Sequence, residues 1–364
     1  MTRIPVRLGP RRYDVLIGSD HARRLLSEIR RLKCGTHPVV LTNSTILRNH
    51  GSDWVRDLSR GGLPVDLLTV ADTERSKSLG TLGRLLNALA DRDGPGRRLF
   101  LILLGGGVVG DLGGVVAGLY RRGIPYLQVP TTLLAQVDSS IGGKTAVDLP
   151  QGKNLVGLFY QPRLVFIDLK FLRTLPDRQF RSGLAEVAKC GVIRDPALFS
   201  FLERTSVSHL RQAEAELGWL ISRAVRVKAS VVEQDERETR GIRTILNFGH
   251  TFGHALEAAT HYSGVVTHGE AVAVGMRVAA QIARRMKLLR NSDADRIGRL
   301  LDRLGLPALT RGVSLTGIQK AMSHDKKWSA SRSWVLPTRI GRVRVVKSVS
   351  DRVVRAAIQN VLEE

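Results

Sequence analysis

A histidine-rich segment carries the side chains whose spacing most directly suggests chemistry. In NFGHTFGHALEAA, residues 247–259, His250 and His254 are four residues apart, and Glu257 follows three residues later. A helix would therefore place all three side chains on one face. Two histidines one helical turn apart are a common pair of metal ligands, although a single histidine is more often a hydrogen-bonded structural residue.

Two other motifs offer further ligands. HGE at 268–270 contains His268, and GLAEVAK at 183–189 contains Glu186 and, three residues later, Lys189. One glutamate with two histidines is a three-ligand set that leaves a metal position open for substrate or water, as catalytic metal sites require. Together the motifs predict a catalytic metal site.

A glycine-rich loop follows an apolar run. GGGVVGD at 105–111 continues LFLILL and leads into LGGVVAGLY, and Gly105, Gly107 and Gly110 match the G-x-G-x-x-G pattern. Glycines at a helix start allow backbone N–H groups to approach a phosphate. The acidic residue that holds a ribose about 20 positions later in the standard fold is missing. Either a dinucleotide binds here in a different way, or the glycines serve a tight turn and close helix packing.

A segment rich in Gly, Ser and Thr, residues 130–162, carries four polar side chains of interest. They are Asp138, Lys144, Lys153 and Asn154. Ammonium and amide groups offer several hydrogen-bond donors. We therefore expect a loop shaped around an anionic ligand rather than an unrelated surface loop.

The elements that must position these residues change in character along the chain. The first half alternates short apolar runs with helical spacing, which is typical of a parallel α/β sheet. Beyond about 175, long amphipathic stretches follow with few strand signals. We predict an α/β domain over 1–175 and a mainly helical domain over 176–364, with a cleft between them. The expected strands are 38–44, 64–70, 98–104 and 125–132, and the expected helices include 78–92, about 210–233 and 271–289.

Composition narrows the class. The chain has 56 Lys+Arg against 33 Asp+Glu and a net charge of +23, which alone would suit a nucleic-acid partner. However, aromatic residues are only 5% and the arginines are spread along the chain, whereas single-strand nucleic-acid sites combine basic grooves with aromatic side chains. The two cysteines provide no disulfide framework, and the longest apolar stretch, 99–110, is too short to span a bilayer. The start does not read as a signal peptide, so we expect a cytoplasmic protein without a nucleic-acid or membrane partner.

The motifs occur in an order that resembles the 3-dehydroquinate synthase family of sugar phosphate cyclases. From about residue 70 to 280 they are GGGVVGDLGG, RGIPYLQVPTTLLAQVDSSIGGKTAVD, GKNLVGLFYQP, FLRTLP, GLAEVAK, DERET, NFGHTFGHALE and HGEAVAVGM. Each motif is weak alone, but eight in sequence are specific.

The resemblance implies an NAD-binding α/β domain followed by a helical metal-binding domain. The implied reaction converts 3-deoxy-D-arabino-heptulosonate 7-phosphate to 3-dehydroquinate and phosphate in the shikimate pathway, which leads to chorismate and the aromatic amino acids. Transient oxidation by bound NAD⁺ acidifies a neighbouring C–H for β-elimination of phosphate, and reduction, ring opening and aldol closure follow. The resemblance also implies a homodimer, because Arg122 reaches in from a neighbouring subunit in this family.

The resemblance assigns residues to each ligand. The metal, Zn²⁺ or Co²⁺, would be held by Glu186, His250 and His268. The cofactor residues would be Asn43, Asp72, Glu74, Lys77, Gly107, Val108, Val109, Gly110, Asp111, Thr131, Thr132, Lys144, Lys153, Phe171, Leu172, Arg173 and Thr174. The catalytic and substrate-binding residues would be Arg122, Asp138, Lys144, Asn154, Lys189, Lys228, Glu238, Arg243, Asn247, His254 and either Lys326 or Lys327.

One spacing departs from the family pattern. Glu238 and Arg243 are five residues apart, where the family has four. We expect a turn near Arg240 and Gly241 to absorb the extra residue.

Two other enzyme classes share parts of this pattern. Sibling cyclases use the same NAD and metal on sugar phosphates that lack a carboxylate, but the carboxylate-binding set of Lys144, Lys228, Arg243 and Asn247 favours the sugar-acid substrate. Metal-dependent alcohol dehydrogenases of similar architecture would share the glycine loop and lack the phosphate-binding groups.

Overall fold

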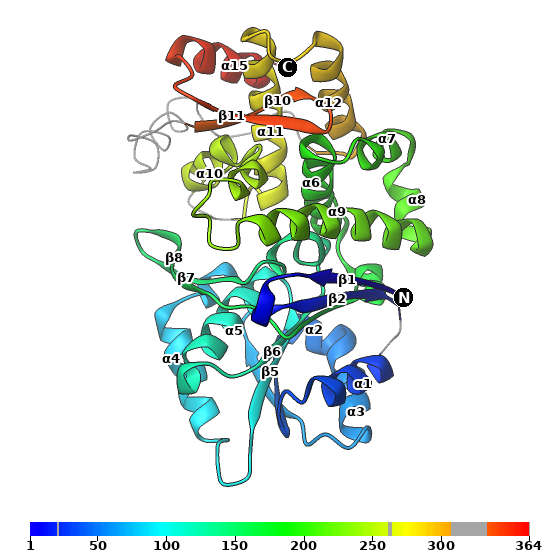
Figure 1. Ribbon diagram of the computed structural model, residues 1–364, viewed down its shortest axis with the longest axis vertical. Coiled ribbons are helices and arrows are strands. Elements are labelled where there is room, and N and C mark those ends of the chain that lie inside the picture. Colours follow the sequence, from blue (N-terminus) through cyan, green and yellow to red (C-terminus); the bar gives the residue numbers. More distant parts are fainter. Residues whose placement is uncertain (20–21, 261–263, 307–332, 364) are drawn as a thin grey trace. The chain divides into compact units, whose positions relative to one another are not determined.

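The protein forms two compact units, Met1–Leu175 and Pro176–Glu364 (Figure 1). The structure is a computed structural model that describes residues 1–19, 22–260, 264–306 and 333–363. The first unit contains a mainly parallel sheet with helices and the second is mainly helical, so the predicted fold class is confirmed. None of the helices in the described ranges combines the length and apolar composition that a bilayer crossing needs.

A seven-stranded sheet forms the centre of the first unit. Its strands are β1 (Thr2–Val6), β2 (Tyr13–Gly18), β3 (His37–Asn43), β4 (Asp66–Val70), β5 (Leu99–Gly105), β6 (Tyr126–Pro130) and β9 (Leu164–Asp168). They lie in the order β1-β2-β9-β6-β5-β3-β4, with β1 and β2 antiparallel and the other neighbours parallel. The predicted strands are β3, β4, β5 and β6, with ends shifted by at most two residues.

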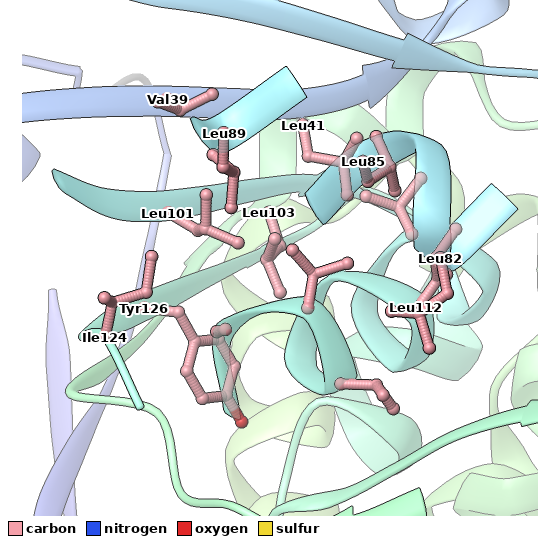
Figure 2. Close-up of a cluster of buried hydrophobic side chains, with 14 of the residues drawn as sticks. Val39, Leu41, Leu82, Leu85, Leu89, Leu101, Leu103, Leu112, Ile124 and Tyr126 are labelled. Carbon is pink, nitrogen blue, oxygen red and sulfur yellow. The ribbon is translucent and has the colours of Figure 1, made fainter. Parts of the chain in front are cut away.

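Helices cover both faces of this sheet. They are α1 (Ala22–Leu32), α3 (Ser52–Arg60), α4 (Leu79–Ala90) and α5 (Gly107–Leu119). Leu101 and Leu103 of β5 pack with α4 and α5 (Figure 2), whereas Phe100 and Ile102 pack with α1 and α3. Successive strand residues point to opposite faces, so a fully buried strand must be apolar throughout. That explains the run LFLILL, all of which is buried.

Short helical segments connect these elements. They are η1 (Gly9–Arg11), α2 (Ser44–Ile46), η2 (Leu47–Gly51), η3 (Glu74–Ser76), η4 (Tyr120–Arg122), η5 (Ala135–Ser139) and η6 (Leu169–Thr174).

The expectation that Asp138, Lys144, Lys153 and Asn154 lie in one loop of the segment 130–162 is wrong. Besides η5, this segment forms an antiparallel hairpin of β7 (Lys144–Leu149) and β8 (Gly152–Phe159). Thr145 of β7 is buried, and a Cβ on Gly114 of α5 would lie 2.1 Å from its methyl carbon. The hairpin therefore depends on close contact with a distant glycine, which local composition does not reveal.

The second unit is built from helices and one small hairpin. Its elements are α6 (Asp177–Ile193), α7 (Pro196–Arg204), α8 (Val207–Gln212), α9 (Glu214–Gln234), η7 (Arg243–Asn247), α10 (His250–Ala259), α11 (His268–Arg285), α12 (Asn291–Arg303), β10 (Ser333–Arg339), β11 (Arg342–Lys347) and α15 (Asp351–Glu363). The predicted helices near 210–233 and 271–289 are α9 and α11. α11 packs against α6, α10, α12, α15 and β10, and is the central helix of this unit (Figure 1).

Candidate metal and cofactor sites

Glu186, His250 and His268 come together in the second unit. Glu186 lies within α6, and the histidines are the first residues of α10 and α11. One potential ligand atom from each residue lies within 4.8 Å of the others. Nε2 of His250 is 3.7 Å and Nε2 of His268 is 3.6 Å from Oε1 of Glu186. The three side chains offer one carboxylate oxygen and two imidazole nitrogens, a donor set that suits Zn²⁺.

Hydrogen bonds fix both imidazole rings. The Nδ1–H of His250 donates to the carbonyl oxygen of Phe248 at 3.2 Å, and the Nδ1–H of His268 donates to Oε2 of Glu257 at 3.2 Å. In this tautomer each Nε2 keeps its lone pair for a metal. The sequence predicted that Glu257 lies on the same helix face as the histidines, because it follows His250 by seven residues, but it did not predict this hydrogen bond.

The charged side chains Glu186 and Lys189 of this site are buried. Glu186 is 1% exposed and forms an ion pair with Lys189, which is 2% exposed. Burial and the Lys189 ammonium hold the pKa of His250 well below its usual range. Burial also lowers the pKa of His268, but its hydrogen bonds with Glu186 and Glu257 outweigh burial and raise the pKa to about 10. A metal ion would therefore compete with a proton for His268.

Glycines allow the helices that carry the histidines to approach closely. Gly249, just before α10, has φ 82°, and a Cβ there would lie 2.7 Å from the carbonyl oxygen of Val272. A Cβ on Gly275 of α11 would lie 1.8 Å from the carbonyl oxygen of Gly249. The glycines of NFGH and VGM are thus required by backbone contact between α10 and α11.

The other predicted substrate residues of this unit fall into two groups. Lys189, Lys228 and Arg243 are buried, whereas Asn247 and His254 are exposed. The His254 ring centroid lies 5.2 Å from that of His250.

A turn absorbs the extra residue between Glu238 and Arg243. Glu238 has φ 59° and Gly241 has φ 72°, and the Asp235 carboxylate accepts hydrogen bonds from three backbone N–H groups of the turn. Oε1 of Glu238 consequently lies 3.4 Å from Nε of Arg243. The turn therefore brings the two side chains together despite the altered spacing.

In the first unit, the predicted cofactor residues follow the carboxyl ends of neighbouring parallel strands. Asn43 ends β3, Asp72 follows β4, and the glycine loop follows β5. Thr131 and Thr132 follow β6, and η6, with Phe171, Leu172, Arg173 and Thr174, follows β9. These ends share one edge of the sheet, where open α/β folds bind ligands. The chain order reverses between β3 and β5, which places the glycine loop at the switch point.

The glycine loop is closely packed, and it also begins a helix. Gly106 caps the start of α5, and Gly107 begins it, together with Val108 and Val109 in its first turn, where N–H groups lack intrahelical partners. A Cβ on Gly110 would lie 2.9 Å from Oε1 of Gln128. Gly110 is therefore needed for close packing, while the first turn presents backbone donors with no bulky side chain at the start.

Lys77 links several predicted site residues. Its side chain is 4% exposed, its Nζ donates to Asp111 at 2.8 Å and it lies 3.6 Å from Glu74. It also donates to the side-chain oxygen of Asn154. Lys153 lies 3.5 Å from the same carboxylate of Glu74. One polar network thus joins four predicted cofactor residues to one predicted substrate residue.

Other predicted positions are also located. Asn43 donates to Asp72 at 2.8 Å. The Thr174 hydroxyl is hydrogen-bonded to Nε2 of His50 at 2.5 Å. The His50 ring also meets the Phe171 ring edge-on, and His50 was not among the residues predicted from the sequence. Arg122 lies in η4, Asp138 in η5, and Lys144 begins β7. Lys326 and Lys327 lie outside the described residues.

Comparison with known families gives a consistent result across the chain. A model described as 3-dehydroquinate synthase N-terminal matches residues 67–182, and one described as 3-dehydroquinate synthase C-terminal matches residues 183–328. A 3-dehydroquinate synthase of Pelotomaculum thermopropionicum is 45% identical over 96% of this chain and 93% of its own length. One of Nostoc punctiforme is 43% identical over 98% of both chains.

Solved structures of related cyclases share the fold. A 2-deoxy-scyllo-inosose synthase complexed with carbaglucose-6-phosphate, NAD⁺ and Co²⁺ has a TM-score of 0.88 and 29% identity, covering 99% of this chain and 100% of its own. The 2-epi-5-epi-valiolone synthase ValA of Streptomyces hygroscopicus, with NAD⁺ and Zn²⁺ bound, has a TM-score of 0.84 and 28% identity, covering 96% of each chain. Both neighbours thus hold NAD⁺ and a divalent metal.

Proposed function

The chain belongs to the 3-dehydroquinate synthase family, and we propose that it converts 3-deoxy-D-arabino-heptulosonate 7-phosphate to 3-dehydroquinate and phosphate. The observation that carries this proposal is the Glu186, His250 and His268 group, in which both histidines direct Nε2 toward one carboxylate. The identity of 45% with a 3-dehydroquinate synthase, against 29% with a sibling cyclase, supports the sugar-acid substrate.

Glu186, His250 and His268 would hold Zn²⁺ or Co²⁺. Their donor atoms fit such a metal, and three protein ligands leave coordination positions open. When bound, the metal supplies Lewis-acid stabilisation of the substrate's hydroxyl and ketone oxygens. The hydrogen bonds from each Nδ1 orient the rings for this role.

NAD⁺ would bind at the carboxyl edge of the sheet in the first unit. The start of α5, which follows the small residues Gly105 to Gly107, would offer its backbone N–H groups to a pyrophosphate. A Cβ on Gly107 would lie 3.3 Å from Oγ of Ser139, so this position has little room for a side chain. Asn43 and Asp72, already joined by a hydrogen bond, offer polar atoms for a ribose. When bound, NAD⁺ supplies a hydride acceptor that is regenerated within each turnover.

The cationic and amide side chains would bind the two anionic groups of the substrate. Lys144, Lys228, Arg243 and Asn247, with Asp138 and Glu238, would hold the carboxylate and hydroxyls. Asn154, Lys189 and His254 would hold the phosphate, with Arg122 and one lysine of the 326–327 pair. Lys189, Lys228 and Arg243 are buried, and charge-assisted hydrogen bonds from cations to carboxylate or phosphate oxygens are stronger than those between neutral groups.

A phosphate-release assay tests the proposal. Purified protein with Zn²⁺ and NAD⁺ is expected to release phosphate from the seven-carbon acid phosphate without net NADH formation, and a chelator should stop the reaction. A sugar phosphate without the carboxylate serves as the matched control and is expected to remain intact. Stoichiometric NADH, no phosphate release, or preference for the control substrate would overturn the assignment.

The proposal extends to a homodimer. In the hairpin, Leu155, Val156, Leu158 and Phe159 of β8 are all exposed, which is a large apolar surface for two strands. Arg122 lies beside this hairpin, because a Cβ on the adjacent Gly123 would lie 3.0 Å from the hydroxyl of Tyr160. A second copy covering the hairpin would bring Arg122 toward the partner subunit.

Sedimentation equilibrium tests the dimer. The wild type is expected to sediment as a dimer and Leu158→Asp as a monomer, while a monomeric wild type would remove Arg122 from the proposed site. We also propose a cytoplasmic location without nucleic-acid or membrane partners, consistent with two cysteines, Cys34 and Cys190, that are buried and unbridged.

A further inference from the structure

Three residues of α6, spaced four apart, meet three consecutive residues at the start of α11. Arg178 forms an ion pair with Glu270, Ser182 contacts Gly269, and Glu186 faces His268. Residues four apart lie on one helix face. One face of α6 thus carries the candidate metal ligand Glu186 and, about two turns earlier, Arg178, which forms an ion pair with α11.

The middle contact leaves no space between the helices. A Cβ on Gly269 would lie 2.0 Å from the carbonyl oxygen of Ser182, and the Gly269 N–H donates to the Ser182 hydroxyl at 3.0 Å. The backbones therefore touch at the point between the ion pair and the ligands. Any rotation of α11 about this contact would change the separation of Glu186 and His268.

Glu270 joins the ion pair to the start of α11. Its carboxylate accepts from Nε and Nη2 of Arg178 at 2.8 and 2.7 Å and from the backbone N–H of Thr267 at 2.8 Å. The Thr267 hydroxyl accepts from the Glu270 N–H at 3.3 Å, which completes a capping box. Arg178 also donates to the carbonyl oxygen of Val265, so the approach to α11 and its first turn are both attached to α6.

We propose that the Arg178–Glu270 ion pair is a positioning device that sets His268 relative to Glu186 and so raises the affinity of the site for its metal. The inference rests on the metal site of the proposed function. Metal ligands must be placed within about 0.2 Å, so a small shift of the first turn of α11 is enough to weaken binding. Arg178 is 51% and Glu270 16% exposed, and such a pair adds little to folding stability. Its effect should therefore appear in metal affinity rather than in unfolding.

The test measures Co²⁺ and Zn²⁺ affinity of the full chain by competition with a chelator. Arg178→Ala is expected to bind metal about tenfold more weakly, as is typical when support of a ligand is lost. The Co²⁺ absorption spectrum should change with it, because coordination geometry changes. Melting of the metal-free protein should shift by no more than about 2 °C.

Matched variants separate positioning from general damage. Glu270→Gln can still close the capping box but loses the charge, so it should weaken metal binding as much as Arg178→Ala, with no further loss in the double variant. Arg178→Lys should give a smaller loss. Arg181→Ala removes another arginine of α6, which pairs with Asp177 and donates to Leu304, and should leave metal affinity unchanged.

The outcomes distinguish this inference from the proposed reaction. If Arg178→Ala and Arg178→Lys bind metal like the wild type, or no more weakly than Arg181→Ala, the positioning role is overturned while the reaction stands. If metal affinity depends on Arg178 but no phosphate is released, the reaction fails and the positioning role stands. A wild type that binds no metal would overturn both.

Discussion

The two candidate sites are positioned in different ways. In the first unit, the predicted cofactor residues are distributed over the ends of β3, β4, β5, β6 and β9 and include a glycine loop with backbone donors. In the second, three buried or partly buried side chains from α6, α10 and α11 converge within 4.8 Å. A distributed site shares its binding energy among many contacts, whereas a three-ligand site depends on each member. Single substitutions should therefore be more damaging in the second unit.

The largest contrast is expected between Glu186→Gln and Lys153→Ala. Losing the carboxylate should remove the metal. The resulting fall in kcat/KM should correspond to a loss of about 4 kcal/mol or more of transition-state stabilisation, because the Lewis acid is lost. Lys153 is 25% exposed beside Glu74, so its loss should weaken NAD⁺ binding by about 1 kcal/mol and leave the metal content intact. Metal analysis and steady-state kinetics check both. Full metal occupancy in Glu186→Gln would contradict the contrast.

Alanine substitutions of two glycines test how tightly the helices of each unit are packed. Gly269→Ala should lower the free energy of unfolding by about 1–3 kcal/mol, because the new Cβ would lie 2.0 Å from the Ser182 carbonyl oxygen. Gly80→Ala in α4 has nothing within 4 Å and should raise it by about 0.5–1 kcal/mol. Thermal melting of the metal-free variants measures both, and equal shifts would refute the distinction.

Glu257→Gln tests whether orientation of a ligand matters as much as the ligand itself. We expect metal to bind about tenfold more weakly, because the charged acceptor of the His268 Nδ1–H is lost. Glu216→Gln is the control, because Glu216 pairs at 3.1 Å with the exposed His209, which is not one of the candidate metal ligands. Chelator competition measures both variants, and identical affinities would show that the Glu257 carboxylate has no such role.

The smallest effect is expected at Glu28, a buried carboxylate of the first unit that pairs with Arg3, Arg24 and Arg31. Burial raises its pKa, but the hydrogen bonds from Arg31 and Arg3 outweigh burial and lower it. Because the folded pKa is below the unfolded value, this stabilisation is present at neutral pH and is lost as pH falls through the folded pKa.

Glu28→Gln should accordingly destabilise the protein at pH 7 by about 1 kcal/mol or less, since the arginines are largely exposed. The difference from the wild type should shrink as pH is lowered below about 4. Denaturant unfolding of both proteins at pH 7 and below about pH 4 measures this difference in stability. A difference that grows in acid would contradict the direction of the pKa shift.

Much of the fold follows from local patterns. The runs at 38–44 and 98–104 are apolar enough to be buried on both faces, and they form β3 and β5. The β7–β8 hairpin was not predicted, because its buried face depends on Gly114 of α5. The histidine spacing likewise predicted one helical face, but His254 is exposed while His250 is buried. Spacing alone does not show which members of a face meet a neighbouring helix.

The sequence by itself determined the kinds of chemistry available, because residue type and short-range spacing are local properties. It supplied the histidines and glutamates, the glycines at a strand end and the apolar strands. Only the tertiary structure decided which atoms meet: Nε2 of His250 and His268 at Glu186, Nδ1 of His268 at Glu257, and Arg178 at Glu270. Those contacts depend on how α6, α10 and α11 pack, and the packing depends on glycines that let backbones touch.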